Sequence, residues 1–316
     1  MSAVPIPTGA WGGDPARKQA SIAAARAALA AGPVVVCVPR LFLADEHRDC
    51  GNVYCAAYGT ADPTELEARA GLPVGTLMLA SAALSACDHY VLADDGIRKR
   101  KRLAGNALEA PIAALEAIPV GVDTEALGRR YVVDLLGRLE VLRGFDDHGL
   151  TAEQQALVRR LAMLHDEGCA DPAEFRALRK AAIAATNAAT AELEAASLAF
   201  VESLAWPLAG LMAELPEILS LGHQGLRACL APERPTPAEA AQMKSVDAMF
   251  EAMGKRIKVE PEFDVDAGVA SIEATPEYRA TRHPAFQVRL EHYDLLAAEA
   301  YAPFAIDLLL GAFRKA

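Results

Sequence analysis

The chain contains few cysteines and few aromatic residues. Only six of its 316 residues are cysteine, which excludes a disulfide-rich scaffold. Aromatic residues make up 6% although hydrophobic residues of all kinds reach 53%, so much of the apolar content consists of small side chains. Small apolar side chains favour closely packed helices over a β-sandwich. The charged fraction of 23% is ordinary for a folded soluble protein and argues against a disordered chain.

The motifs of common nucleotide and hydrolase sites are also missing. The chain has no G-x-x-x-x-G-K-[ST], no G-x-G-x-x-G after a predicted strand, no H-E-x-x-H and no G-x-S-x-G. An enzyme would therefore need a site built from residues dispersed along the sequence. The pair His165-Asp166, which ends a predicted helix, faintly resembles the metal-binding pair of the HD phosphohydrolases. A histidine stabilised at the negative end of a helix dipole is the simpler explanation.

No segment predicts secretion or insertion into a membrane. Residues 1–13 lack the basic and apolar regions of a secretory signal, and their prolines and glycines predict a flexible arm. The most apolar stretch, 195–213, carries Glu202 and Pro207 near its middle, which favours a buried helix kinked at the proline. We therefore expect a cytoplasmic protein that does not contact a membrane.

Charge is divided unevenly between two parts of the chain. Residues 1–105 carry 11 basic and 10 acidic residues, whereas the remainder carries 20 basic and 32 acidic residues, for a total net charge of −11. The acidic remainder would be a poor surface for nucleic acid. A nucleic-acid site is therefore expected only in the first third.

The predicted fold is mainly α with a small α+β N-terminal region, in which a winged-helix-like segment precedes a multi-helix domain. After the arm, residues 14–105 form the α+β region, with a strand predicted at 34–38 and a hairpin at 90–103. Residues 106–316 form the helical domain, with a linker near 231–236. Alternating apolar residues around Pro261, from Ile257 to Val265, predict a short edge strand or extended arm.

Helical periodicity is clearest after residue 106. Apolar residues recur at spacings of three and four, which predicts one buried helix face formed by Leu127, Tyr131, Leu135, Leu139 and Leu142. The patterns that begin at Thr151, Asp171 and Thr236 are typical of capped helix starts. The apolar stretch 290–313 predicts a last helix, interrupted at Pro303.

Residues 62–103 resemble a winged-helix DNA-binding domain. Two short predicted helices flank Gly71, and the hairpin that follows turns at Asp95-Gly96. Its return strand contains five consecutive cations, which would lie along a phosphate backbone: Arg98, Lys99, Arg100, Lys101 and Arg102. The segment departs from the family at Glu67, where a small residue normally packs between the helices. The would-be recognition helix, 74–86, also lacks arginine, lysine, asparagine and glutamine to read bases. A solvated charged hairpin beside a buried helix pair is the alternative.

A second group of residues has the composition of a zinc site. Cys37, His47, Cys50 and Cys55 would form a tetrahedral Cys₃His set, in which two residues separate the histidine from the next cysteine. The set lacks a Cys-x₂-Cys pair, and cysteine is also common as a small buried hydrophobic residue. Zinc is therefore the one cofactor that the sequence suggests.

Three classes of function remain open. The first is a nucleic-acid-binding protein that contacts DNA or RNA through the basic hairpin, while the acidic helical domain binds a protein partner or a second copy. The second is a helical structural or interaction protein of a larger assembly. The third is an α-helical enzyme with a dispersed site. The first is preferred because it alone accounts for the clustered cations.

Overall fold

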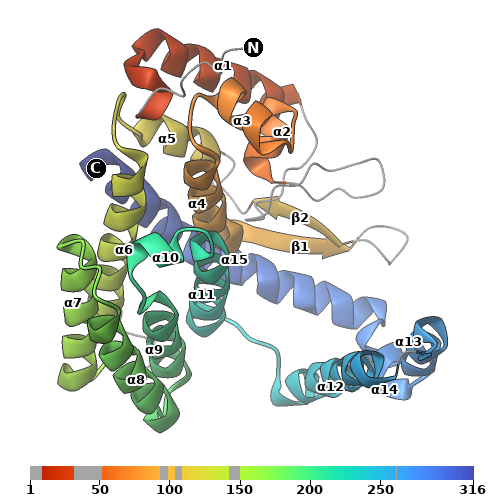
Figure 1. Cartoon of the computed structure of the whole chain (residues 1–316). Helices are drawn as coiled ribbons and strands as arrows, with labels where there is room; N and C mark the ends of the chain where they lie inside the picture. Colours follow the sequence, from red (N-terminus) through yellow and green to blue (C-terminus); the bar gives the residue numbers. More distant parts are fainter. Residues whose placement is uncertain (1–8, 32–51, 93–98, 104–108, 142–149, 261) are drawn as a thin grey trace.

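The computed structural model describes residues 9–31, 52–92, 99–103, 109–141, 150–260 and 262–316, and these residues are mainly α-helical (Figure 1). The mainly α class predicted from composition is therefore confirmed. The strand predicted at 34–38 lies outside the described residues. Within the described residues the only sheet is one two-stranded hairpin.

The first described residues are packed, although they were expected to belong to a flexible arm. A 3-10 helix spans Ala10–Gly13, and the side chain of Trp11 is completely buried. The backbone N–H of Trp11 donates to the carbonyl oxygen of Gly71 at 2.8 Å, and that of Ala10 donates to Val122 at 3.0 Å. The backbones of Gly9 and Gly121 lie so close together that a Cβ added at Gly9 would come within 2.8 Å of the Gly121 carbonyl oxygen.

Four helices of the N-terminal region follow, each started by a polar cap or a proline: α1 (Pro15–Ala31), α2 (Val53–Tyr58), α3 (Pro63–Ala70) and α4 (Val74–Leu84). Gly71 adopts φ +74° between α3 and α4, a left-handed conformation that glycine tolerates. The chain bends by 89° between the two helices. Glu67, expected to disturb this junction, instead caps α4, since its Oε1 accepts from the backbone N–H of Val74 at 2.8 Å.

A 3-10 helix (Ser85–Cys87) leads directly into the predicted hairpin. Strand β1 (Asp88–Leu92) pairs antiparallel with β2 (Lys99–Leu103), and Tyr90 lies opposite Lys101. The predicted turn at Asp95-Gly96 lies outside the described residues. Strand β1 packs against the long C-terminal helix, so the hairpin is attached to the helical body through β1.

The body is built from helices that pack largely in chain order: α5 (Ala110–Ala117), α6 (Thr124–Val141), α7 (Ala152–Asp166), α8 (Pro172–Ala188), α9 (Glu192–Leu204), α10 (Leu208–Leu211) and α11 (Leu215–Leu230). The predicted stripe on α6 is buried at Leu127, Tyr131, Leu135 and Leu139, while Leu142 lies outside the described residues. The apolar stretch 195–213 breaks at Pro207, as expected. Trp206 in this stretch is 46% exposed, and the guanidinium of Arg179 lies 3.8 Å from its ring centroid.

The C-terminal part consists of α12 (Pro237–Val259), α13 (Val265–Glu273), α14 (Pro276–Thr281) and α15 (Pro284–Lys315). Helix α15 starts beside α14 and runs into the centre of the body, where it packs against α4, α5, α6, α11 and β1 (Figure 1). It is long and apolar enough to cross a membrane by length and composition alone, and 44% of its most apolar window is buried.

Two local predictions in this part are wrong. The expected extended arm from Ile257 to Val265 is helical at both ends, because α12 continues to Val259 and Asp264 caps the start of α13. Pro303 does not interrupt α15, which continues through this exposed residue as one helix. A single cluster of buried side chains extends from Ala10 to Phe313 and crosses residue 105, where a domain boundary was expected.

Candidate functional site

The second of the two helices that flank Gly71, α4, lies inside the protein. In α4 every side chain from Thr76 to Leu84 is buried, and Gly75 is its only exposed residue. A recognition helix must lie on the surface to enter the major groove of DNA. The resemblance to a winged helix, with 74–86 in the place of the recognition helix, is therefore not supported, because the alanines and leucines of this helix fill the core instead.

The basic hairpin is the part of the DNA-binding prediction that lies in the described structure. Lys99, Arg100, Lys101 and Arg102 make up most of β2, and Arg98 lies outside the described residues. The register places Arg100 opposite Val91 and Lys101 opposite Tyr90. Among the described strands β2 pairs only with β1, so no described strand covers its other edge.

Only one of the four predicted zinc ligands lies within the described residues. Cys37, His47 and Cys50 lie outside the described residues, and Cys55 is completely buried in α2. The described residues contain no group of three histidine, cysteine or carboxylate side chains suited to a metal ion. The zinc hypothesis stays a prediction.

A buried polar group that the sequence did not reveal joins three helices of the body. His223 of α11 lies between two tyrosines, with Nε2 at 2.6 Å from the hydroxyl of Tyr131 on α6 and Nδ1 at 2.8 Å from that of Tyr301 on α15. Burial lowers the pKa of His223 to about 3 and raises the pKa of both tyrosines. Burial also raises the pKa of the nearby Cys87 thiol to about 12. All four side chains are therefore uncharged at neutral pH, and the histidine and the two tyrosines form a hydrogen-bonded part of the core.

His165 belongs to the core as well. Its Nε2 lies 3.0 Å from the carbonyl oxygen of Leu204, its ring packs at 5.3 Å from the ring of Phe175, and burial lowers its pKa. This contact ties α7 to the end of α9. The resemblance of His165-Asp166 to a metal-binding pair has no support in this geometry, and Asp166 follows at the end of α7.

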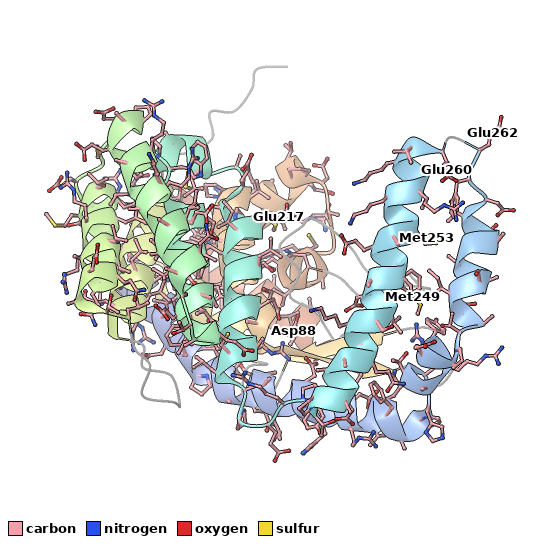
Figure 2. The ribbon with its side chains drawn as sticks, turned by 90° about the horizontal axis from the view of Figure 1, so that it is seen from below. Asp88, Glu217, Met249, Met253, Glu260 and Glu262 are labelled. Atoms are coloured by element: carbon pink, nitrogen blue, oxygen red, sulfur yellow. The ribbon has the colours of Figure 1, made fainter. Side chains whose placement is uncertain are left out.

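A groove between α12 and α13 is open to solvent and has a volume of about 920 Å³. Met249 and Met253 line it from α12, and Phe263 lines it from the connection between the two helices (Figure 2). An added Cβ on Gly268 of α13 would come within 2.7 Å of the Phe263 ring, so glycine is what allows this ring to lie against α13. The guanidinium of Arg256 covers the ring at 4.6 Å from its centroid.

One end of the groove is acidic. Glu260, Glu262, Asp264 and Asp266 fall within seven residues of the sequence, and the first three line the groove. Arg256 holds Glu260 through two hydrogen bonds of 3.1 and 2.9 Å, which lower the pKa of this carboxyl group. Asp264 caps α13 by accepting from the N–H of Ala267 at 2.9 Å. Figure 2 shows Glu260 and Glu262 beyond the end of α12, on the same side of the molecule as Met253.

This groove could not be found by sequence analysis, because its apolar residues do not share one periodic pattern. Met249 and Met253 are four residues apart on one helix, but Phe263 and Ile272 come from later segments. No known protein family, curated protein or solved structure matches the chain.

Proposed function

We propose that the chain is a helical interaction protein whose α12–α13 groove binds a basic amphipathic helix of a protein partner. The observation that carries this proposal is a methionine-lined apolar groove with an acidic end, in a part of the chain that has almost no core of its own. It corresponds to the interaction-protein class left open by the sequence. A cytoplasmic location stays a prediction.

The lack of a core distinguishes α12–α14 from the body. Among the described residues 237–281, only Glu239, Val246, Ile272 and Thr281 are buried. Three larger apolar side chains are instead exposed near the end of α12 and the start of α13: Ile257 at 41%, Val259 at 75% and Val265 at 43%. Clustered exposed apolar residues of this kind mark interaction sites, because a partner removes them from water.

The lining of the groove suits a helix. Methionine side chains are flexible and polarisable, so they adapt to apolar side chains of different shapes. An amphipathic helix that places one apolar face in such a groove is a common mode of peptide recognition. Residues 237–281 carry nine acidic and five basic residues, so their net charge of −4 favours a basic partner.

The proposal is tested with two synthetic amphipathic helices of about five turns, one built from leucine and lysine and the other from leucine and glutamate. We expect the lysine peptide to bind the full chain at least about tenfold more tightly in isothermal titration calorimetry, since a tenfold difference is about 1.4 kcal/mol. Equal binding of the two peptides would contradict the proposed charge preference.

A matched pair of methionine substitutions locates the binding site. Met253→Gln should weaken binding of the lysine peptide several-fold, because it introduces a polar group into the apolar groove. Met163 of α7 is 49% exposed and lies outside the groove, so Met163→Gln should leave binding unchanged. Equal effects of the two substitutions would show that the peptide does not occupy the groove.

A second candidate function is nucleic-acid binding through β2. It is supported by the pairing of β1 and β2, which forms the hairpin on which the hypothesis depended. With α4 buried, only the hairpin would contact DNA or RNA, and phosphate contacts carry no base information. We therefore expect weak binding without sequence preference.

Alternation along a strand provides the test of this second function. Successive side chains of a strand point to opposite faces, so we expect Arg100 and Arg102 to share one face of β2 and Lys99 and Lys101 to share the other. If the hairpin lies on a duplex, replacing one pair by alanine should weaken binding far more than replacing the other pair. The slope of log affinity against log salt should fall by roughly one unit for each contact removed. No binding to duplex or RNA at low salt would end this candidate.

A further inference from the structure

A cavity separate from the α12–α13 groove lies where the C-terminal helices join the body. Its walls are the start of α9, the end of α11, residues 231–235, the start of α12 and the first half of α15, and its volume is about 900 Å³. Protein interiors contain few voids larger than a water molecule, so a space of this size is more than a packing defect. Small-molecule sites typically have volumes of about 300–1,000 Å³ and are mostly apolar with a few polar groups.

The helices leave this space unfilled because they line it with small residues. Met243 of α12 and Leu290 of α15 are the larger aliphatic-like side chains of the lining. Most of the other apolar positions are alanine or glycine: Ala195, Ala196, Gly225, Ala228, Ala240 and Ala297. The space beside α11 is open at Gly225, where an added Cβ would meet nothing within 4 Å.

Both arginines of the lining are engaged within the protein. Arg227 donates to the backbone carbonyl oxygen of Asp88 at 2.5 Å and to that of Asp294 at 2.7 Å, and it forms an ion pair with the Asp294 carboxylate. Arg234 forms an ion pair with Glu192. These contacts occupy two of the four lining carboxylates together with both guanidinium groups.

The two remaining carboxylates also have partners. Oε2 of Glu233 lies 3.5 Å from Nε2 of His292, and Glu291 interacts with another group of the protein. A charged ligand would therefore lose its water without gaining a free group of opposite charge, which costs free energy. Tyr293 of the lining carries an uncharged hydroxyl, which can donate to or accept from a neutral polar group.

We propose that this cavity binds a neutral small molecule that has an apolar chain or ring system and at most one uncharged polar group. The apolar lining removes the body of the ligand from water, and the pairing of the lining charges with one another leaves nothing that favours an ion. The site is separate from the groove proposed to bind a helix, and its occupant is a small molecule rather than a protein segment.

The test compares three ligands that have the same alkyl chain and different charge: decanol, decanoate and decylammonium. Each is titrated at neutral pH, below its micelle concentration, against the full chain loaded with Nile red, a neutral dye that fluoresces in apolar sites. We expect decanol to displace the dye at a concentration at least about tenfold lower than either ion does. Equal potency of the three ligands, or higher potency of an ion, would overturn the choice of a neutral ligand. No binding of Nile red or decanol would overturn the site itself.

Chain length tests whether the apolar body is buried. Octanol has two methylene groups fewer than decanol and should bind about tenfold more weakly, because each buried methylene contributes to the transfer from water. Equal affinities of the two alcohols would show that the chain stays in water, which would contradict the proposal.

Substitutions that fill the cavity locate the ligand. Gly225→Leu adds a side chain to the wall formed by α11 and should weaken decanol binding at least about tenfold, since each displaced methylene contributes to affinity. Ala240 is exposed on α12, so Ala240→Trp is a second filling variant in case the first does not fold. Gly137→Leu on α6 is the control, because Gly137 lies outside the cavity and an added Cβ there also meets nothing within 4 Å. If both filling variants bind decanol as tightly as the control, the ligand lies elsewhere and the proposal is wrong.

Two methionines of α12 separate the cavity from the groove. Met243→Lys places a charge in the cavity and should weaken decanol binding, whereas Met253→Lys places the same charge in the groove and should leave it unchanged. The reverse result would place the ligand in the groove and overturn the proposal. Saturating decanol should not displace the lysine-rich peptide. If that peptide fails to bind, the groove is not its site, but the decanol measurements still decide whether the cavity binds a neutral ligand.

Discussion

Nε2 of His223 lies 2.6 Å from the hydroxyl oxygen of Tyr131, and both side chains are completely buried. The contact joins α11 to α6, and the second hydrogen bond of His223 joins α11 to α15. The three helices that form the centre of the body therefore meet at one neutral imidazole. A proton on this ring would be a buried charge without a carboxylate partner among these contacts.

Stability should therefore fall on mild acidification. The pKa of His223 is lowered from 6.5 to about 3, so between these values the unfolded chain binds a proton that the folded chain does not. The free energy of unfolding then decreases as pH falls below 6.5, at up to about 1.4 kcal/mol per pH unit. Urea unfolding at pH 7, 6 and 5 measures this slope above the range in which ordinary carboxylates titrate.

His223→Gln should reduce the slope between pH 7 and 5, although His165 contributes in the same direction because its pKa is also lowered. If the variant does not fold, NMR titration of the histidine rings in the unmodified protein gives the same information. An imidazole of His223 that titrates near pH 6.5 in the folded protein would contradict the prediction.

The α6 stripe gives a prediction of stability. Leu135 is completely buried, so Leu135→Ala should lower the free energy of unfolding by about 2–5 kcal/mol, as the removal of buried methyl groups does. Leu221 on α11 is 68% exposed, and Leu221→Ala should change the free energy of unfolding by less than about 0.5 kcal/mol. Chemical denaturation of both variants checks this, and a loss below about 1 kcal/mol for Leu135→Ala would mean that the stripe is not core.

The prediction of the buried face of α6 succeeded and the winged-helix interpretation of α4 failed for one reason. Periodicity locates a buried face only when charged side chains mark the opposite face. On α6, Arg129, Arg130 and Arg138 lie off the apolar stripe, so periodicity located the buried side. Residues 74–86 contain no charged side chain at all, and not only no base readers. Such a composition is typical of a helix buried on all sides. The DNA-binding interpretation depended on local spacing, whereas burial of α4 depends on α5, α11 and α15, which are distant in sequence.

The candidate sites were missed for a related reason. The groove and the cavity are lined by side chains from several separate segments, and no local pattern reports which segments meet. The capped start of α12 was predicted correctly from Thr236 to Glu239. Its contact with Arg289, fifty residues later, could not be predicted from the sequence.

The contact between Glu239 and Arg289 predicts that Arg289 holds the start of α12 against α15. Nε of Arg289 donates to Oε1 of Glu239 at 2.5 Å. The backbone N–H of Thr236, followed by this hydrogen bond from Arg289, lowers the pKa of Glu239 to about 2. Arg289 is half exposed, so Arg289→Ala should cost less than about 1 kcal/mol of global stability. It should nevertheless increase hydrogen exchange in the first turns of α12. Arg279→Ala on α14 is the control, since Arg279 forms no ion pair with a described residue, and equal exchange in both variants would contradict this role.

The zinc hypothesis predicts a measurable metal content. Protein purified without added metal should contain about one equivalent of zinc by elemental analysis, and Cys50→Ser should lose it. Because structural zinc sites are coupled to folding, a chelator should also lower the melting temperature of the unmodified protein. If the purified protein contains no zinc and a chelator does not change its melting temperature, the zinc hypothesis is wrong.

Two glycines of the C-terminal helices make a matched test of the groove. An added Cβ on Gly268 would come within 2.7 Å of the Phe263 ring and 3.1 Å of Sδ of Met253, whereas a Cβ on Gly254 of α12 would meet nothing within 4 Å. Gly254→Ala should therefore stabilise the protein by up to about 1 kcal/mol, because alanine favours helices. Gly268→Ala should gain less or destabilise, since the ring must move.

The same pair of variants should differ in binding. Displacement of Phe263 changes the shape of the groove, so Gly268→Ala should weaken binding of the lysine-rich peptide several-fold, while Gly254→Ala should leave it unchanged. Calorimetric titration of both variants with the same peptide measures this difference. If Gly268→Ala binds as tightly as the unmodified protein while its melting temperature falls, the ring has moved without effect on the peptide. The peptide would then bind elsewhere, and the groove would not be the interaction site.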